Sequence, residues 1–311
     1  MRVVAALGGN ALLRRGEAMT PAHQRANVRR AASALAPLRR AGHELIVTHG
    51  NGPQVGLLAL QAMAGPADAA PPLDVLGAES EGMIGYLIEQ ELDSLLSPGM
   101  PVAALLTLVL VDSEDPAFSH PTKPIGPLYD RQEAERMAAL HGWSLIADGD
   151  AWRRAVPSPL PKAILELKAI ELLVRHGVTV ICAGGGGIPV SRLRDGSLAG
   201  IEAVIDKDRV AALLARELAA DCLLLLTDVE AVYLDWNGPQ PRAIASAGAE
   251  VLCPDDFAAG SMRPKLEAAI AFARQTGRPA AIGQMKDAEA LLSGTAGTRI
   301  EAGRGRLTLR P

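Results

Sequence analysis

Aromatic residues are scarce in this sequence and make up only 3% of its 311 residues. Proteins that bind nucleobases or single strands rely on aromatic stacking platforms, so this scarcity argues against such a function. Lysine and arginine form no long run, and the formal net charge of −4 differs from the basic surface typical of nucleic-acid-binding domains. We therefore expect no nucleic acid partner.

Long apolar runs are also missing. No uninterrupted apolar run reaches the roughly 18 residues that a membrane-spanning helix needs, so we expect no membrane partner. The first ten residues, MRVVAALGGN, have a short apolar stretch, but Gly-Gly-Asn stands where the apolar region of a secretion signal would continue. This segment predicts a first core strand.

The three cysteines, Cys182, Cys222 and Cys253, are too few and too widely spaced for a disulfide framework or a zinc site. Cys182 and Cys222 lie inside apolar, strand-like runs, which predicts buried thiols. Sparse unpaired thiols are typical of a reducing compartment, and we expect the cytoplasm.

Strand-like and helix-like stretches alternate along the chain. Strands are predicted at 3–7, 44–49, 102–112, 178–183, 222–228 and 279–283, and helices at 21–42, 73–96, 161–176, 206–219 and 261–276. A break in the second helix is predicted near Gly82–Gly85. This alternation predicts an α/β fold in which helices cover both faces of a mostly parallel sheet. In such sheets, ligands bind at the carboxyl ends of the strands.

Residues 113–161 interrupt this alternation. They are rich in proline and polar residues, with a short helix predicted at 131–141 and a strand at 143–147. Such an insert within a single domain of residues 1–311 predicts a protruding subdomain or lid over a site. A plain surface excursion is the alternative.

Glycine-rich turns follow three of the predicted strands, and Thr227-Asp228 ends a fourth. These turns are Gly8-Gly9-Asn10, Gly50-Asn51-Gly52 and the run Gly184, Gly185, Gly186 and Gly187. Such turns before a helix present backbone N–H groups that favour phosphate or another anion, although each alone is also compatible with a simple tight turn. The sequence contains neither the P-loop pattern nor the dinucleotide-binding fingerprint.

Charged residues accompany these turns at two predicted helix starts. Asp206, Lys207 and Asp208 begin one helix, Lys265 lies in the first turn of another, and Lys123 stands between two prolines of the insert. The carboxylates are suited to hold Mg²⁺ or to orient a lysine, and Asp206 is also suited to be a simple helix cap. Lysines, N–H groups and carboxylates without a general base suit phosphoryl transfer to an acceptor that is already an anion.

Nine stretches in order, spanning about residues 2 to 301, resemble the carbamate kinases of the amino-acid kinase family. They are ALGGNALL, THGNGPQVG, EGMIGYLIEQEL, TKPIGP, WRRAVPSP, CAGGGGIPV, EAVIDKD, LTDVEAVYLDW and GSMRPKLEAAI. TKPIGP looks like the insert that distinguishes carbamate kinases from acetylglutamate, glutamate and uridylate kinases of the same fold.

The resemblance implies a three-layer αβα sandwich with a mostly parallel sheet of about eight strands, a small protruding insert and a homodimer. It implies that ATP and carbamate give ADP and carbamoyl phosphate reversibly, with Mg²⁺, and that the reaction usually runs toward ATP in catabolism, as in arginine catabolism. Two alternatives stay open: another acyl-phosphate-forming kinase of this fold, and a nucleotide-binding regulator without catalysis.

The resemblance also implies roles for particular residues. Lys207 and Lys265 would neutralise phosphate charge, and Lys123 would reach the site from the protruding insert. Asp206 and Asp208 would orient a lysine or lie near a Mg²⁺ ion carried mainly by the nucleotide. The residues expected around carbamate are Gly8, Gly9, Asn10, Gly50, Asn51 and Gly52. Those expected around the nucleotide are Gly184, Gly185, Gly186, Gly187, Asp228, Tyr233 and Met262.

The sequence departs from the family pattern at Asp150-Ala151, where a Gly- or Arg-containing turn is expected, and at Arg263, where the family often has a small or apolar residue. The first departure leaves the details of the lid open, and neither touches the lysines or the Asn-Gly turns.

Overall fold

A computed structural model describes the chain except residues 14–16, 65–70, 237, 259–261, 304 and 311, and except the side chains of residues 10 and 11. Its central sheet has the strand order β13-β14-β16-β15-β12-β1-β2-β9-β3, with β17 paired to β14. The strands are β1 (Arg2–Leu7), β2 (Glu44–His49), β3 (Val102–Ala104), β9 (Thr179–Ile181), β12 (Cys222–Thr227), β13 (Tyr233–Leu234), β14 (Arg242–Gly248), β15 (Ala280–Gln284), β16 (Thr298–Glu301) and β17 (Leu307–Leu309).

The six strands from β15 to β3 are parallel, which confirms the predicted mostly parallel sheet. At the other end, β16 runs antiparallel to β15, and β13 and β17 pair antiparallel with β14. The sheet therefore has ten strands where about eight were expected, because short β13 and β17 extend its far edge.

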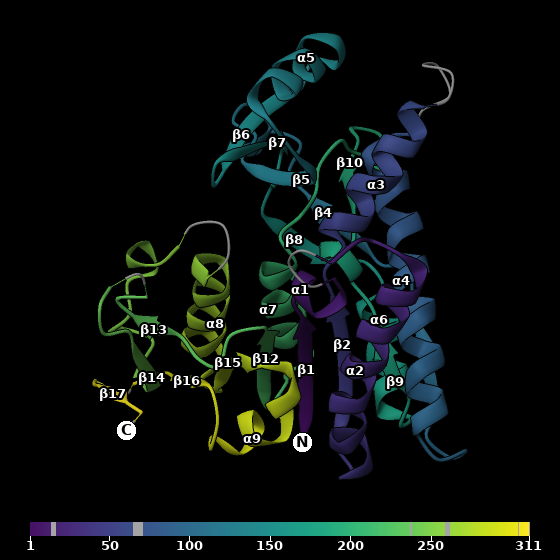
Figure 1. The fold of residues 1–311 in the computed structure, drawn as a ribbon. Coiled ribbons are helices and arrows are strands. Elements are labelled where there is room, and N and C mark those ends of the chain that lie inside the picture. Colours follow the sequence, from purple (N-terminus) through teal and green to yellow (C-terminus); the bar gives the residue numbers. More distant parts are fainter. Residues whose placement is uncertain (14–16, 65–70, 237, 259–261, 304, 311) are drawn as a thin grey trace.

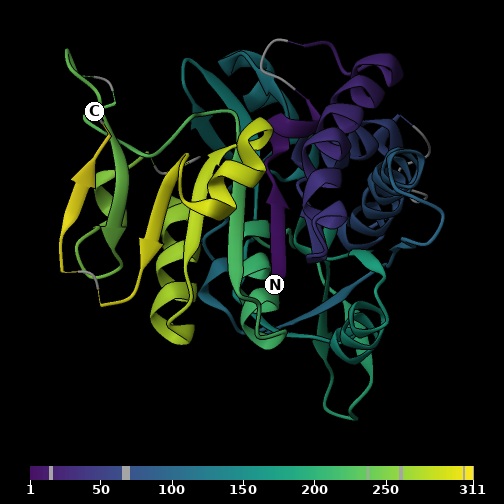
Figure 2. The ribbon, with the colours of Figure 1, turned by 90° about the horizontal axis from the view of Figure 1, so that it is seen from below.

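Helices cover both faces of this sheet (Figures 1 and 2). They are α1 (Gly9–Leu12), α2 (Pro21–Arg40), α3 (Gly52–Met63), α4 (Leu73–Leu95), α6 (Leu167–Arg175), α7 (Lys207–Glu217), α8 (Met262–Thr276) and α9 (Ala288–Ser293). Strand β1 shows why three layers form, because its side chains alternate between two separate cores. Val4 and Ala6 pack in the core that includes residues of α6, α7 and α8, whereas Val3, Ala5 and Leu7 pack with α2, α4 and α9.

Helix boundaries follow local signals in the sequence. The Thr20 hydroxyl accepts a hydrogen bond from the backbone N–H of His23 at the start of α2, and Pro21 occupies the first helical position. Gly42, with φ of +85°, lies just beyond the end of this helix. Asp206 caps α7 by accepting from the N–H groups of Asp208 and Arg209. Because these signals are local, the sequence predicted both helix starts.

Helix α4 runs without interruption from Leu73 to Leu95, so the predicted break near Gly82–Gly85 is wrong. Gly85 lies so close to β3 that an added Cβ would be 3.3 Å from the Cβ of Ala104. The missing side chain therefore allows close helix–sheet packing and does not mark a bend.

The single strand predicted at 102–112 is two strands in different sheets. After β3, β4 (Leu108–Val111) joins a second sheet of order β11-β10-β4-β8, with β8 (Pro161–Ile164), β10 (Ile188–Arg192) and β11 (Leu198–Gly200). At the crossing, the backbone N–H groups of Thr107 and Leu108 donate to the carboxylates of Glu81 and Glu166. The helix predicted at 161–176 begins only at Leu167, because β8 pairs with β4 first.

The insert forms a small sheet of its own that protrudes beyond the strand ends (Figure 1). Strands β5 (Lys123–Tyr129), β7 (Ala151–Val156) and β6 (Ser144–Asp148) pair in that order, and α5 (Arg131–His141) has the bounds expected from the sequence. Among the helices of the described residues, none combines the length and apolar character needed to cross a bilayer.

Candidate active site

Three glycine turns meet at one edge of the sheet because β1, β2 and β9 are adjacent and parallel. The Gly50 backbone N–H donates to the Leu7 carbonyl at 3.1 Å. A Cβ added to Gly50 would lie 3.1 Å from the Gly9 nitrogen and 3.3 Å from Cδ of Lys207. The turns after β1 and β2 therefore lie against one another and against a lysine from α7, as the sequence predicted for this edge.

The Asn51 side chain joins the β2 turn to the turn after β9. Its amide Nδ2 donates to the Ser80 hydroxyl at 2.8 Å, and the residue is buried. Gly185 has φ of +69°, and any Cβ there would overlap the Asn51 amide. Gly184–Gly186 form a 3-10 turn, and the backbone of Ile205 lies against Gly186. The four-glycine turn is thus packed between Asn51 and the start of α7.

Three lysines from separate elements converge on two carboxylates at the same edge. Lys123 Nζ of the insert lies 2.6 Å from Asp206, Lys207 Nζ of α7 lies 2.5 Å from Asp208, and Lys265 Nζ of α8 lies 3.1 Å from Asp208. The Lys207 and Lys265 side chains are each only 11% exposed. Three ammonium groups facing two carboxylates leave a net positive charge, which suits an anionic ligand because buried charge needs a partner.

Electrostatics favour the ionised forms of Asp206, Asp208 and Lys265. Burial favours the neutral acids, but the neighbouring ammonium groups outweigh it and hold the pKa values of Asp206 and Asp208 below their usual range. Burial also works against the charge of Lys265, yet Asp208 and Asp206 raise its pKa. Burial lowers the pKa of Lys207, with the Lys265 charge adding to this and Asp208 opposing it.

The two carboxylates accept hydrogen bonds from the lysines and are not arranged as a set of metal ligands. Each Asp208 oxygen accepts from one ammonium group, while Asp206 accepts from Lys123 through one oxygen and from two backbone N–H groups through the other. Among the residues that the structure describes, no three His, Cys, Asp or Glu side chains are grouped to hold a metal ion. A divalent cation here would need most of its ligands from a bound molecule.

The other residues expected at the site come from several separate elements. Gly52 is the first residue of α3, and Asn10 lies in α1, with its side chain outside the described part of the chain. Asp228 follows β12, and its charge helps to raise the pKa of Lys265. Tyr233 lies in β13 with its ring edge-on to Trp236, and Met262 begins α8 and packs on the core.

Sequence reasoning did not single out two residues that contact the site, Ser80 and Glu81 of α4. Ser80 accepts from Asn51, and Glu81 accepts from the backbone N–H of Gly184 at 2.8 Å. A signal was present, because Ser80 lies on the stripe formed by Leu76 and Ile84, which predicts burial. A buried polar residue on an apolar stripe needs a hydrogen-bond partner.

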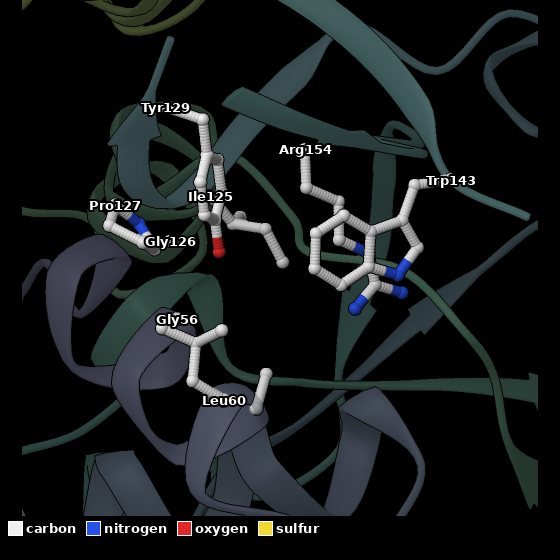
Figure 3. A pocket seen from close by; sticks show the side chains of 9 residues that line it. Gly56, Leu60, Ile125, Gly126, Pro127, Tyr129, Trp143 and Arg154 are labelled. Atoms are coloured by element: carbon white, nitrogen blue, oxygen red, sulfur yellow. The ribbon is translucent and has the colours of Figure 1, made fainter. Parts of the chain in front are cut away.

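The insert rests on α3 through two glycines. A Cβ on Gly56 would overlap the backbone of Gly126, which has φ of +74°. Figure 3 shows the α3 side of this contact, with Leu60, facing Ile125 of the insert. The Arg153 guanidinium donates to the Gly126 carbonyl from the insert itself, at 2.7 and 3.0 Å. Lys123, whose Nζ lies 2.6 Å from Asp206, begins the same strand, β5, that contains Gly126.

The model of the amino acid kinase family matches residues 1–284. The chain belongs to the amino acid kinase family. Within that family, it is 54% identical over 300 residues to the carbamate kinase of Haemophilus influenzae, covering 96% of both chains. It is 53% identical over 304 residues to the carbamate kinase of Rhizobium meliloti, covering 97% of this chain and 94% of that one.

A solved structure of this family has the same fold. The carbamate kinase from Giardia lamblia bound to AMP-PNP superposes with a TM-score of 0.88 and 41% sequence identity, covering 97% of this chain and 98% of the other. The resemblance to carbamate kinases seen in nine sequence stretches is therefore confirmed, as is the predicted αβα sandwich. This amino acid kinase is an ATP-dependent phosphotransferase.

Proposed function

We propose that this protein transfers a phosphoryl group reversibly between ATP and carbamate, and that it runs mainly from carbamoyl phosphate and ADP toward ATP. The observation that carries this proposal is the convergence of Lys123, Lys207 and Lys265 on Asp206 and Asp208 beside the glycine turns. A positive, largely buried cluster next to glycine turns suits a phosphoryl group that passes between two small anions.

In the direction of ATP formation, a terminal oxygen of ADP attacks the phosphorus of carbamoyl phosphate. A P–O bond to ADP forms while the P–O bond to carbamate breaks, and carbamate leaves as an anion without needing a proton. Lys207 and Lys265 neutralise charge on the transferred group, and Lys123 approaches from the insert. The chain thus contributes positioning and charge neutralisation, which dominate catalysis of this reaction.

We assign the carbamoyl end to the turns after β1 and β2. Carbamate is too small to offer a side chain, so recognition of its planar carboxylate and amine falls to the amide of Asn51 and to backbone N–H groups other than those of Gly8 and Gly50, which donate to the carbonyls of Leu226 and Leu7. The residues proposed here are Gly8, Gly9, Asn10, Gly50, Asn51 and Gly52. We assign the nucleotide to the other side, against Gly184, Gly185, Gly186, Gly187, Asp228, Tyr233 and Met262.

We propose that Mg²⁺ enters with the nucleotide. The ion neutralises charge on the phosphate oxygens that it binds. Asp206 and Asp208 hold the lysines, so their contribution to the ion is secondary to that of the phosphates. We also propose that residues 113–161 act as a lid within one domain of residues 1–311, since the insert supplies Lys123 to the cluster.

We propose a cytoplasmic homodimer that serves a catabolic pathway such as arginine catabolism. Strand β3 is an edge of the central sheet, and an open edge favours pairing or cover by another surface. Beside it, Tyr86 of α4 is 56% exposed and Leu106 is 54% exposed, which makes this face suited to a second copy of the chain. Free thiols at Cys182 and Cys222 suit a reducing compartment.

The decisive experiment is ATP formation from ADP, Mg²⁺ and carbamoyl phosphate by purified protein, with acetyl phosphate as the control donor. We expect rapid ATP formation with carbamoyl phosphate alone. Equal use of both donors would favour a broader acyl-phosphate kinase. Binding of ADP without any turnover would favour the regulatory alternative.

Substitution of Asn51 tests whether this residue acts on carbamoyl phosphate or on ADP. In Asn51→Ala, we expect KM for carbamoyl phosphate to rise at least about tenfold, the scale of one lost buried hydrogen bond, while the Kd for ADP changes little. Steady-state kinetics and calorimetry with ADP measure the two effects. Equal losses for both ligands would contradict an acceptor-side role for Asn51.

Substitution of Gly56 tests the seating of the insert. In Gly56→Ala, the new methyl group meets the Gly126 backbone, so the insert must shift and withdraw Lys123 from the site. We expect turnover to fall about tenfold or more, a large response to a small displacement of a positioned group. Gln61→Ala, at an exposed position of the same helix, is the matched control. Unchanged turnover in Gly56→Ala would show that catalysis does not depend on the close approach of the insert to α3.

A further inference from the structure

Helix α4 makes hydrogen bonds to both halves of the site through two consecutive residues. Ser80 accepts from the Asn51 amide at 2.8 Å and donates to the Gly77 carbonyl at 2.8 Å. Because the bond to Ser80 engages Nδ2, it fixes which way the amide of Asn51 faces. Both Ser80 and Glu81 are buried, so these bonds form away from bulk water, where they are strong.

Glu81 binds the start of the four-glycine turn and the chain crossing beside it. One carboxylate oxygen accepts from the Gly184 N–H at 2.8 Å and the other from the Thr107 N–H at 3.3 Å. The Thr107 hydroxyl accepts from the Ala183 N–H at 2.9 Å. Ala183 has φ of +52°, a left-handed conformation that is unfavourable for a residue other than glycine. Surrounding bonds must therefore hold the turn in its observed shape.

We propose that Ser80 and Glu81 are positioning residues that align the two half-sites, Ser80 through Asn51 on the acceptor side and Glu81 through Gly184 on the nucleotide side. This inference rests on the proposed function. Neither side chain needs to touch a substrate. A single rigid helix thereby sets the spacing between the two groups that exchange the phosphoryl, and this spacing controls the rate of transfer.

Glu81 also makes the nucleotide side sensitive to pH. An ionised carboxylate accepts from both N–H groups, whereas a protonated one presents a hydroxyl group to one of those donors. Burial raises the pKa of Glu81 to about 8, with the Gly184 and Thr107 N–H groups opposing the rise. A cavity of about 150 Å³ beside Glu81 provides room for water to exchange its proton.

The titratable groups around Glu81 come from several elements. The titratable residues that line the same cavity are His49 of β2, Tyr86 and Glu89 of α4, and Cys182. The charge of Glu166 adds to the raised pKa of Glu81. Burial lowers the pKa of His49 to about 4 and raises that of Cys182, so both stay neutral near pH 8. The turn should therefore be held more firmly, and KM for ADP should fall, as the pH rises through about 8.

The test compares Glu81→Gln and Ser80→Ala with Glu89→Gln as the matched control. Glu89 lies on the same helix and cavity and accepts a similar bond, from the Ala104 N–H at 3.1 Å, but it does not contact the glycine turn. In Glu81→Gln, we expect KM for ADP at pH 9 to rise about tenfold relative to the wild type and to lose its dependence on pH between 7 and 9. In Ser80→Ala, we expect a rise of about fivefold in KM for carbamoyl phosphate instead. Glu89→Gln should match the wild type.

The inference is overturned if Glu81→Gln behaves like Glu89→Gln, or if Glu81→Gln and Ser80→Ala each change the two KM values equally. If Glu81→Gln does not fold, Thr107→Val removes the acceptor of the Ala183 N–H without altering a buried charge. This variant should also raise KM for ADP, and an unchanged value would overturn the role of the turn. If the wild type forms no ATP, the proposed function fails, and calorimetry with ADP across pH 7–9 still tests Glu81.

Discussion

Lys265→Ala should lower turnover at least about a hundredfold, the scale of losing one preorganised group that stabilises transition-state charge. Lys265 Nζ lies 3.1 Å from Asp208, its side chain is only 11% exposed, and its pKa is raised by the two carboxylates. It is therefore charged and oriented before any ligand arrives. An alanine leaves the phosphoryl group without this charge, and water in a narrow, largely buried site replaces it poorly.

Steady-state ATP formation from carbamoyl phosphate measures this effect. The matched control is Lys168→Ala, because Lys168 also lies in the first turn of a helix, α6, but is exposed to solvent. We expect the control to retain wild-type turnover. A Lys265→Ala enzyme with near-normal turnover would remove Lys265 from the phosphoryl site and would leave Lys207 and Lys123 as the charge-neutralising groups.

Asp208→Asn should impair both turnover and stability. Asp208 is buried between Lys207 and Lys265, so loss of its charge leaves two buried ammonium groups facing one another. Removal of one partner from a buried ion pair is typically destabilising by about 3 kcal/mol or more. We expect the free energy of unfolding at neutral pH to fall by an amount of this order, and turnover to fall as the lysines lose their orientation.

The difference in the free energy of unfolding between the wild type and Asp208→Asn should decrease in acid. The neighbouring lysines outweigh the effect of burial and hold the pKa of Asp208 below its usual range. The ionised Asp208 therefore contributes its full stabilisation at pH values above the pKa of about 3.9 that an aspartate has in the unfolded chain, and this stabilisation is lost as the pH falls further. Denaturant titrations should therefore show a gap between wild type and Asp208→Asn that is constant from about pH 6 to 7 and narrows below about pH 4. A gap that widened in acid would contradict the ion-pair account.

An exposed ion pair serves as the control for Asp208. Asp255 pairs with Arg263 at 3.3 Å, and its side chain is 80% exposed. Because solvent screens such pairs, Asp255→Asn should change the free energy of unfolding by less than about 1 kcal/mol and leave turnover intact. A comparable loss in both variants would show that the Asp208 effect is not specific to the buried cluster.

Local chemistry explains which parts of the fold were predictable from the sequence. The periodicity of apolar residues in 44–49 and 222–228, the Thr20 cap and the Asp206 cap act over a few residues, so each element could be placed before the structure was known. Parallel strands bring their carboxyl ends to one edge, so the meeting of the Gly50 and Gly184 turns also followed from the pattern.

Other elements could not be placed because their geometry depends on distant partners. Residues 102–112 form one apolar run, but Glu81 and Glu166 bind the backbone at Thr107 and Leu108 and divert the chain into a second sheet. The glycines of α4 suggested a break, whereas Gly85 is small because β3 packs against it. Periodicity cannot distinguish such cases, since the deciding contacts come from elsewhere in the chain.

The sequence by itself determined the αβα class, the glycine turns at the strand ends and the residue types of the site that we propose for phosphoryl transfer, because these depend on local pattern and composition. Only the tertiary structure decided which lysine meets which carboxylate. Lys123 is 83 positions from Asp206, and Lys265 is 57 positions from Asp208, so their pairing follows from packing of the insert, α7 and α8. The tertiary structure likewise revealed the hydrogen bonds of Ser80 and Glu81. A buried polar side chain needs a hydrogen-bond partner, but only the folded chain shows which residue that partner is.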